Sequence, residues 1–380
     1  MILGDGPQEP TGLGRIARDL AGLIAADPDL PVDLVQVGGS LPPVWTEWRH
    51  YPLDRSQGDW GASYIEALWE SCFGRSPGIL WIIWDPGRCA AFLNLKLPIQ
   101  RWAYPAIDAD NINGTLGGPA REALASFDQV IAYGRWASTI LRTLRPSVPY
   151  LPHGLSLEIY QQPPTEAEQA WVHETLGPYH TDHHILVGCV ATNQPRKDLG
   201  LYCHTLSKLR ERGLHVYGWL HTDTLVKDWA VPQLIDDFGL QRRITVTLPE
   251  LTDRQLALLY QRCDITIAPG LGEGFCYPIV ESLAAGTMVV HGDFGGGAEL
   301  IPKVEWRFPV KALRLESVYA VKRPVFDVED VANAINRALL WRELVGRETA
   351  KAYCQGSVAH LGWSSLWPHW RSWLKRGLRG

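Results

Sequence analysis

The sequence predicts an α/β protein of two domains in which strands and helices alternate. Three observations favour this fold class. The 380 residues leave room for two domains of ~100–200 residues each. Continuous apolar runs such as Ile79 to Trp84 are typical of buried parallel strands, and helical apolar patterns follow them. A fresh alternation opens at Ile185, after a polar stretch from Leu155 to His184 that we take as the domain junction.

Composition narrows the class of protein. An apolar content of 46% and a charged content of 20% describe an ordinary globular chain, and a net charge of −5 gives no bulk reason to expect nucleic-acid binding. The seven cysteines are odd in number and never spaced CxxC, which argues against a disulfide framework or a structural zinc site. Without a long apolar run or a signal-type N-terminus, we expect a cytoplasmic protein.

The first half opens on a short strand, Met1 to Leu3, and a glycine-bearing turn. A helix with one apolar face is predicted from Arg15 to Ala26, and a second strand from Val32 to Val37. A strand, a glycine turn and a helix start form an arrangement that can cradle a phosphate. A dinucleotide site is disfavoured because the GxGxxG spacing is absent.

The remainder of the first half combines buried strands with irregular sequence. We expect a long loop from Leu41 to Trp60, in which Trp45, Trp48 and Arg49 are acceptor-binding candidates or, more simply, cover a core. Further strands are predicted for Trp102 to Ile107, Gln129 to Tyr133 and, ending in a PHG turn, Val148 to Gly154. His153 in that turn can face a ligand or serve the core, and we weight the two equally.

In the second half, the strand Ile185 to Val190 is followed by the loop ATNQPRKDLG and a helix from Leu199 to Arg212. Arg196 and Lys197 therefore stand at the carboxyl end of a strand, next to a helix start. Cations and backbone N–H groups in such a place can share one anion.

The segment Gly270 to Val290 follows a buried strand, Ile265 to Ala268. It contains a glycine turn, a helix that begins near Pro278 and a new strand at Met288. Seven residues separate Glu273, in the turn, from Glu281, on the helix. Ligands of parallel sheets bind beyond the carboxyl ends of the strands, so both carboxylates could accept hydrogen bonds from hydroxyls of one ligand.

This segment, GLGEGFCYPIVESLAAGTMVV, resembles the Glu-x7-Glu signature of retaining GT-B glycosyltransferases, especially glycosyltransferase family 4. The resemblance implies two Rossmann-like domains facing a central cleft: residues 1–155 on the acceptor side and 156–357 on the nucleotide-sugar side. The helix 358–380 would cross back to the N-terminal domain. Four further segments resemble the family's loops: Gly12–Arg15, Val148–Gly154, Ala191–Gly200 and Phe294–Leu300.

The resemblance also implies roles for individual residues. Glu273 would contact hydroxyls of the donor sugar and Glu281 the ribose, while Arg196 and Lys197 would bind the diphosphate. Asp108 would position a hydroxyl, and the loop 249–251 would hold the nucleobase through its backbone. The other donor-binding candidates are Gly14, Arg15, Asn193, Leu248, Gly274, Phe275 and Cys276. Cys189 and Cys276 replace residues that are common in the family.

The implied reaction is transfer of a hexosyl group, with retention, from a nucleoside-diphosphate sugar to an unidentified hydroxyl. We expect no cofactor and no metal. The Asp108–Ala109–Asp110 triplet matches the metal motif of the other large glycosyltransferase fold, but the rest of the chain does not. The acceptor can be a glycan, a lipid-linked sugar or a small metabolite. The alternatives are a hydroxylated base in DNA, or a non-catalytic sugar-nucleotide-binding protein.

The tail from Gly362 to Gly380 carries tryptophans at helical spacing among basic residues. Two interpretations stay open. The helix can pack on the N-terminal domain, which we favour, or it can lie on an anionic surface at the inner face of a membrane.

Overall fold

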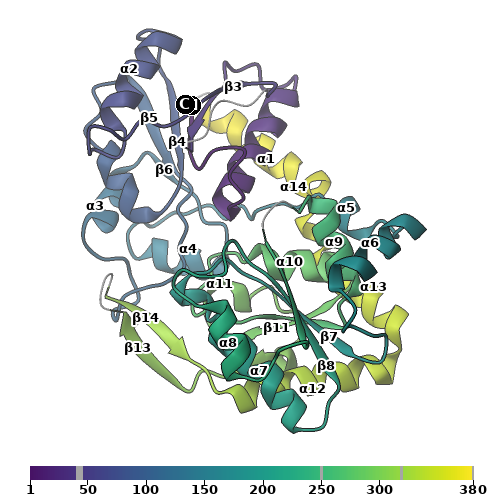
Figure 1. Cartoon of the computed structure of the whole chain (residues 1–380). Coiled ribbons are helices and arrows are strands. Elements are labelled where there is room, and N and C mark those ends of the chain that lie inside the picture. Colours follow the sequence, from purple (N-terminus) through teal and green to yellow (C-terminus); the bar gives the residue numbers. More distant parts are fainter. Residues whose placement is uncertain (40–45, 249–250, 317–319, 379–380) are drawn as a thin grey trace. The chain divides into compact units, whose positions relative to one another are not determined.

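The structure is a computed structural model that describes residues 1–380 except 40–45, 249–250, 317–319 and 379–380. The chain forms two compact units (Figure 1). The first consists of Met1–Gly154, Glu316–Val321 and Ser364–Gly380, and the second of Leu155–Leu315 and Lys322–Trp363.

The first unit is built on a six-stranded parallel sheet in the order β3-β2-β1-β4-β5-β6. The strand order reverses between β1 and β4, which makes the carboxyl ends of these two strands the switch point at which doubly wound sheets bind ligands. The strands are β1 (Ile2–Gly4), β2 (Val35–Gly38), β3 (Arg49–Tyr51), β4 (Gly78–Ile83), β5 (Ile99–Ala103) and β6 (Gln129–Val130).

Helices connect these strands. Helix α1 begins at Gly12, earlier than the predicted Arg15, because the Thr11 hydroxyl accepts a hydrogen bond from the Gly14 N–H and so caps the helix. The apolar face that the sequence indicates is buried. The other helical segments are α2 (Ala62–Phe73), η1 (Pro86–Phe92), α3 (Gly118–Ser126) and α4 (Arg135–Arg142); α1 is Gly12–Ala26.

Three sequence predictions for this unit need correction. The strand predicted for Trp102 to Ile107 lies earlier, at Ile99–Ala103. The predicted loop from Leu41 to Trp60 contains the edge strand β3, whose three residues are too short to show a periodic pattern. Within that loop, the Trp48 indole donates to Gln36 and Arg49 pairs with Asp33, whereas Trp45 lies outside the described residues. The predicted strand from Val148 contributes only an isolated bridge, Ala132 with Tyr150.

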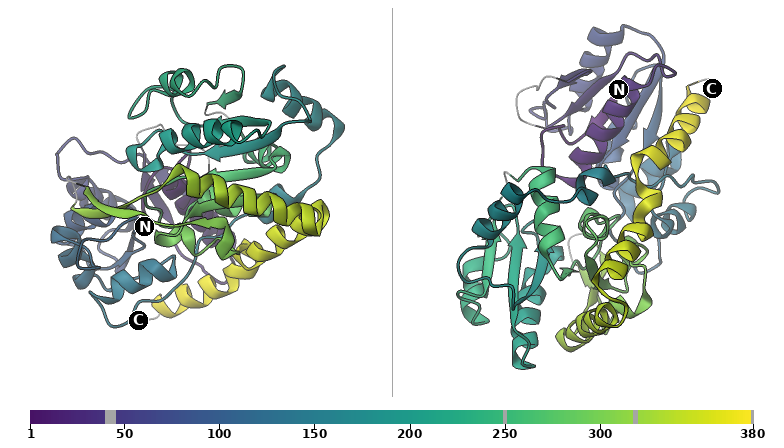
Figure 2. Two further views of the ribbon diagram at one scale, coloured as in Figure 1. Left: turned by 90° about the horizontal axis from the view of Figure 1, so that it is seen from below. Right: turned by 90° about the vertical axis from the view of Figure 1, so that its right-hand side faces the viewer.

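Helix α14 (Trp363–Gly377) packs on the first unit, which confirms the predicted return of the C-terminal helix (Figure 2). Trp373 lies 4.6 Å from Trp102, and Trp370 lies 5.7 Å from Trp81, measured between ring centroids. The Trp367 indole donates to Asp27 at 2.8 Å. The apolar face of the helix is thus covered by protein. Among the described residues, no helix has the length and apolarity needed to span a membrane.

The second unit repeats the same strand order in a second parallel six-stranded sheet, β12-β11-β10-β7-β8-β9. Both sheets are therefore Rossmann-like, as predicted. The strands are β7 (Ile185–Val190), β8 (Val216–His221), β9 (Ile244–Thr247), β10 (Ile265–Ala268), β11 (Met288–Gly292) and β12 (Arg307–Phe308). A separate two-stranded sheet comprises β13 (Ala312–Glu316) and β14 (Val321–Val325).

Helices α7 and α10 lie where the sequence predicts them, and α6 starts at a capping box of Thr165 and Glu168. The sequence does not mark helix α13, because its buried face consists of Ala350, Cys354 and Val358, which give a weak apolar pattern. The helices are α5 (Leu157–Gln161), α6 (Glu166–Leu176), α7 (Leu199–Glu211), α8 (Val231–Asp237), α9 (Asp253–Arg262), α10 (Tyr277–Ala284), α11 (Gly295–Ala298), α12 (Val328–Val345) and α13 (Arg347–Val358).

Candidate functional site

Glu273 stands in the turn between β10 and α10, at the carboxyl edge of the second sheet. Its carboxylate is 6% exposed. Gly270 leaves room for this acid, because a Cβ at that position would collide with the Glu273 carboxylate. The local sequence therefore folds the acid inward, beside the loop that follows β7.

Two cations from that neighbouring loop meet Glu273. Lys197 Nζ lies 2.6 Å from Oε1, and Arg196 Nη1 lies 3.5 Å from Oε2. The same Arg196 nitrogen donates to the Gly272 carbonyl at 3.1 Å. Both cations belong to the short helix η2 (Pro195–Lys197). Because β7 and β10 are adjacent in the sheet, residues 76 and 77 positions apart in the chain form one cluster.

The electrostatics of this cluster favour an ionised acid. Burial alone would raise the pKa of Glu273, but the charges of Lys197 and Arg196 outweigh it and lower that pKa. An ionised carboxylate can only accept hydrogen bonds. Lys197 and Arg196 carry two positive charges and Glu273 one negative charge. The cluster therefore has a net charge of about +1 at the carboxyl edge of the second sheet, which suits an anionic ligand.

The three glycines that open α11 pack directly against the loop that carries Glu273. The Gly296 N–H donates to the Glu273 carbonyl at 2.9 Å, and a Cβ on Gly296 would collide with the Gly274 carbonyl. The close approach is between the start of α11 and the loop after β10, and it fixes the backbone that carries Glu273.

His291 is a site residue that sequence reasoning missed. It is buried on β11, opposite Ala268 in register, and its Nδ1 lies 2.6 Å from the Ala268 carbonyl oxygen. Burial lowers the pKa of His291, although that hydrogen bond and Glu273 act in the opposite direction. A polar residue near the end of a strand beside β10 is the signal that could have found it.

Glu281 lies in a different environment from Glu273. Its two oxygens accept hydrogen bonds from the hydroxyls of Tyr160 and Tyr260, each at 3.1 Å, and its carboxylate is buried. The two acids of the signature therefore have separate sets of protein partners, one cationic and one phenolic. Neither tyrosine is marked by the sequence pattern.

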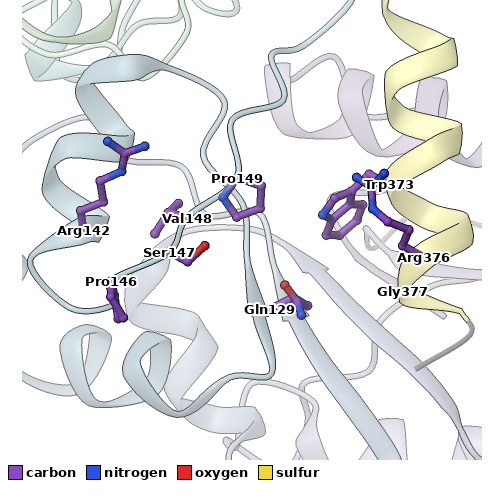
Figure 3. A pocket seen from close by; sticks show the side chains of 9 residues that line it. All are labelled: Gln129, Arg142, Pro146, Ser147, Val148, Pro149, Trp373, Arg376 and Gly377. Carbon is purple, nitrogen blue, oxygen red and sulfur yellow. The ribbon is translucent and has the colours of Figure 1, made fainter.

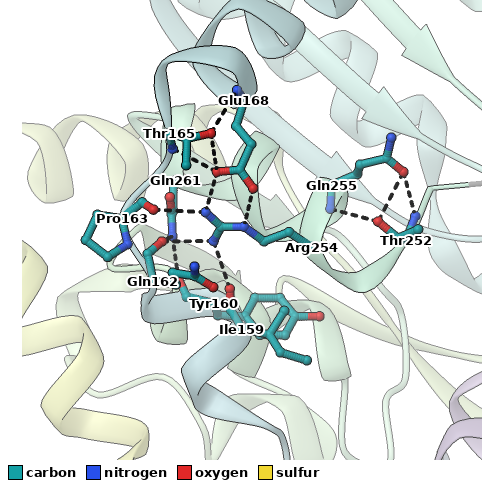
Figure 4. Close-up of polar contacts among 10 residues, drawn as sticks. All are labelled: Ile159, Tyr160, Gln162, Pro163, Thr165, Glu168, Thr252, Arg254, Gln255 and Gln261. Carbon is teal, nitrogen blue, oxygen red and sulfur yellow. Dashed lines mark hydrogen bonds and ion pairs between the residues drawn. The ribbon is translucent and has the colours of Figure 1, made fainter.

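A polar network fixes the segment that bears Tyr160 (Figure 4). Arg254 on α9 forms a two-nitrogen ion pair with Glu168, at 2.8 and 2.9 Å, and donates to the carbonyls of Ile159, Gln162 and Pro163. Hydrogen bonds from Arg254 lower the pKa of Glu168 to about 2. Glu168, which caps α6, and Arg254, on α9, thereby fix the position of α5, whose Tyr160 donates to Glu281.

Comparison with known proteins agrees with this architecture. Residues 184–340 match the family described as glycosyl transferases group 1. Sucrose-phosphate synthase from Thermosynechococcus elongatus superposes with a TM-score of 0.75 at 16% identity, over 99% of this chain and 98% of the other. HepE from Anabaena, solved with UDP-glucose, gives 0.69 at 14% identity, over 99% of both chains. The chain has the GT-B glycosyltransferase fold.

Among curated sequences, the D-inositol 3-phosphate glycosyltransferase of Mycobacterium ulcerans is 29% identical over 143 residues, 38% of this chain and 29% of its own length. The GT-B chain described here spans less than half of the length of each of the curated relatives that it matches.

The remaining donor-side candidates of this GT-B chain differ in their surroundings. Phe275 is buried edge-on against Tyr277, and Cys276 adopts a left-handed φ of 64° as the N-cap of α10 without a side-chain capping bond. Gly274 is half-buried between Glu273 and Phe275, whereas Leu248 is exposed. Pro249 and Glu250, in the predicted nucleobase loop, lie outside the described residues.

Asn193 has a structural task. Its Nδ2 donates to the carbonyls of Thr224 and Trp229, and its Oδ1 accepts from the Trp229 N–H at 2.8 Å. The side chain is fully buried. The amide is therefore engaged in holding the loop after β8.

In the first unit, Gly14 lies inside the first turn of α1, where a Cβ would meet the Glu9 carbonyl, and Arg15 follows it half-buried. Asp108 is half-buried beyond β5, and Asp110 is buried. Within the described ranges, no group of three or more acidic, His or Cys side chains could hold a metal ion.

His153 serves the core of the first unit. Its ring stacks on Tyr133 at 4.8 Å, and its Nδ1 lies 3.0 Å from the Tyr104 hydroxyl. Burial lowers the pKa of His153 to about 3.

A surface pocket of about 480 Å³ lies near the start of β6 and the C-terminal ends of α4 and α14 (Figure 3). It therefore occurs at the amino edge of the first sheet, away from the carboxyl ends where GT-B ligands are expected. Its lining residues are Gln129, Arg142, Pro146, Ser147, Val148, Pro149, Trp373, Arg376 and Gly377.

Proposed function

We propose that the protein is a retaining, metal-independent glycosyltransferase that moves a hexosyl group from a nucleoside-diphosphate sugar to a hydroxyl acceptor. The observation that carries this proposal is the buried ion cluster of Glu273, Lys197 and Arg196 at the carboxyl edge of the second sheet. The matching chains agree with it: one is named for sugar transfer to D-inositol 3-phosphate, and another was solved with UDP-glucose.

The cations would act on the leaving group. When the bond between the sugar C1 and the diphosphate oxygen breaks, negative charge develops on that oxygen. Lys197 and Arg196 stabilise it, together with the positive end of the α10 helix dipole. The acceptor oxygen forms its new bond to C1 on the same face, and its proton passes to the departing diphosphate.

Two acids would orient the donor. Glu273, held ionised by its cations, accepts a hydrogen bond from a sugar hydroxyl. Glu281 accepts from the ribose in exchange for one of its tyrosine hydroxyls. Gly274, Phe275 and Cys276 form the backbone between these two positions. In the first unit, Asp108 positions a hydroxyl and the turn with Gly14 and Arg15 borders the substrates.

A ligand panel tests the donor class. Thermal unfolding of the full chain is followed with UDP, GDP and ADP and their glucose or mannose conjugates, because a ligand that binds only the folded state raises apparent stability. One nucleoside diphosphate and its sugar should raise the Tm. If none of these nucleotides does so, donor binding is disproved.

Turnover with the selected donor then separates an enzyme from a binding protein. Release of nucleoside diphosphate should fall to a few per cent or less in Lys197→Ala. Lys227→Ala, an exposed lysine of the same unit, is the matched control and should be unaffected. Donor binding without any release, with or without acceptors, would favour the non-catalytic alternative.

A further inference from the structure

The first unit carries a second cluster of charged and aromatic side chains, at the switch point of its sheet. Trp84 follows directly after β4, and Arg88, four residues later, lies in η1. Trp60 and Arg55 come from the loop between β3 and α2. Since β2 and β1 separate β3 from β4, this loop crosses the carboxyl ends of two strands to reach Trp84.

Both guanidinium groups lie over both indoles. The Arg88 Cζ is 4.3 Å from the Trp84 ring centroid and 5.0 Å from that of Trp60. The Arg55 Cζ is 4.8 and 6.0 Å from the same two centroids. Stacking uses the flat face of a guanidinium and leaves its in-plane N–H donors for a carboxylate or phosphate.

The charges of the cluster are unbalanced. Arg88 pairs with Asp85 at 3.3 Å, and Asp85 is half-exposed. Among the described residues, Arg55 forms no ion pair. The nearby Asp59 is engaged at the start of α2, where it accepts from the N–H groups of Gly61 and Ser63. One guanidinium is therefore left for an anion.

Two further observations set this cluster apart from a structural one. Trp60 is 46% exposed and adopts a left-handed φ of 58°, a strained conformation for a bulky residue. The indole Nε1 of the fully buried Trp84 has no hydrogen-bond partner among the described residues. An exposed ring and an unused buried donor suit a site that a ligand completes.

We propose that this cluster binds the acceptor, and that the acceptor is a sugar or polyol that carries a phosphate or carboxylate. The apolar face of the acceptor's sugar or polyol ring lies on the indole of Trp60. The phosphate or carboxylate of the acceptor lies between Arg55 and Arg88. This inference rests on the proposed glycosyltransferase function, but the site can be tested by itself.

Calorimetric titration of the full chain with glucose 6-phosphate, glucuronate and glucose provides the test. At least one anionic probe should bind at least about tenfold more tightly than glucose, and the phosphate and carboxylate arms decide between the two groups. Arg55→Gln and Arg88→Gln should each lower the ratio of the affinity for the anionic probe to that for glucose by about tenfold or more. This is the size of one charge-assisted contact. Arg142→Gln, an exposed arginine at the amino edge of the same unit, should not change it.

The inference is overturned if glucose binds as well as the anionic probes, if none of the three binds, or if neither Arg55→Gln nor Arg88→Gln changes the preference. Those results leave the glycosyltransferase proposal standing wherever nucleotide binding and turnover are observed. Conversely, absence of any nucleotide effect on Tm disproves the transferase proposal, while the anion titration still reports on the Arg55–Arg88 site.

Discussion

Glu273 and Glu281 show how one residue type acquires two chemical characters. Glu273 lies between two cations that lower its pKa, and Glu281 lies between two phenols. Removing the charge of Glu273 leaves Lys197 and Arg196 without their anion, so the site becomes more positive. Binding of a diphosphate and turnover of the sugar should therefore respond differently to the same substitution.

For Glu273→Gln we expect turnover to fall by about 10² or more, the size of one lost transition-state contact, while the affinity for the nucleoside diphosphate stays equal or rises. Lys197→Ala should weaken both. Calorimetric titration and initial rates measure the two quantities. A Glu273→Gln variant with normal rates would remove this residue from the proposed mechanism.

The lowered pKa of the buried His153 ring predicts that the stability of the protein depends on pH. The pKa of His153 is lowered from 6.5 to about 3 in the folded state, so the unfolded chain binds the proton more readily. Stability is full above pH 6.5 and is lost as the pH falls from there toward 3, by up to ~1.4 kcal/mol per pH unit from this group. In His153→Phe, the free energy of unfolding, measured with urea at several pH values between 4 and 6, should depend less steeply on pH. An unchanged pH dependence of the unfolding free energy would contradict a neutral, buried His153 imidazole.

At the scale of elements, the contact between the Glu273 loop and the start of α11 depends on the absence of a side chain at Gly296. A Cβ at Gly296 would collide with the Gly274 carbonyl, and neither backbone can withdraw without breaking the hydrogen bond from Gly296 to Glu273. The Glu273 loop and the start of α11 are therefore packed as one piece.

Gly296→Ala should destabilise the protein by ~1–3 kcal/mol, as overpacking does elsewhere, and should lower turnover by displacing Glu273. Gly356→Ala is the matched control: it lies in α13 with open space around the added methyl, so it should be neutral or stabilising by up to ~1 kcal/mol. Denaturant unfolding compares the two. Equal stabilities would show that the loops can separate at little cost.

The elements that the sequence predicts best are those with strong local patterns. The strands β7 and β10 occupy the predicted residues, because each is a short, mainly apolar run that begins directly after a polar residue, His184 or Asp264. Strand β3 and helix α13 were not predictable, since one is three residues long and the other buries small side chains. The partners of Glu281 could not be read either, because Tyr160 is 121 residues away and nothing local marks it.

Over the whole molecule, the chain builds its first unit from distant parts. Trp370 is fully buried in the first unit, and its indole donates to the Pro152 carbonyl at 3.2 Å. Residues near position 370 thus complete a core that begins with β1. The sequence indicates this return only through a helical spacing of tryptophans, which is equally compatible with a membrane surface.

Trp370→Ala should cost ~3–5 kcal/mol, as loss of a large buried ring does. Leu378→Ala, which removes an exposed side chain just beyond α14, should change stability by less than ~0.5 kcal/mol. Calorimetric unfolding measures both. A small effect of Trp370→Ala would mean that α14 is dispensable for the first unit.

The position of α14 has a consequence for biosynthesis. A ribosome releases the strands of the first sheet early, but the indoles of Trp81 and Trp102 stay without their cover until Trp363–Gly377 has been translated, after the whole of the second unit. The half of the protein that is made first therefore finishes folding last, and nascent chains have to keep that aromatic surface from aggregating in the meantime.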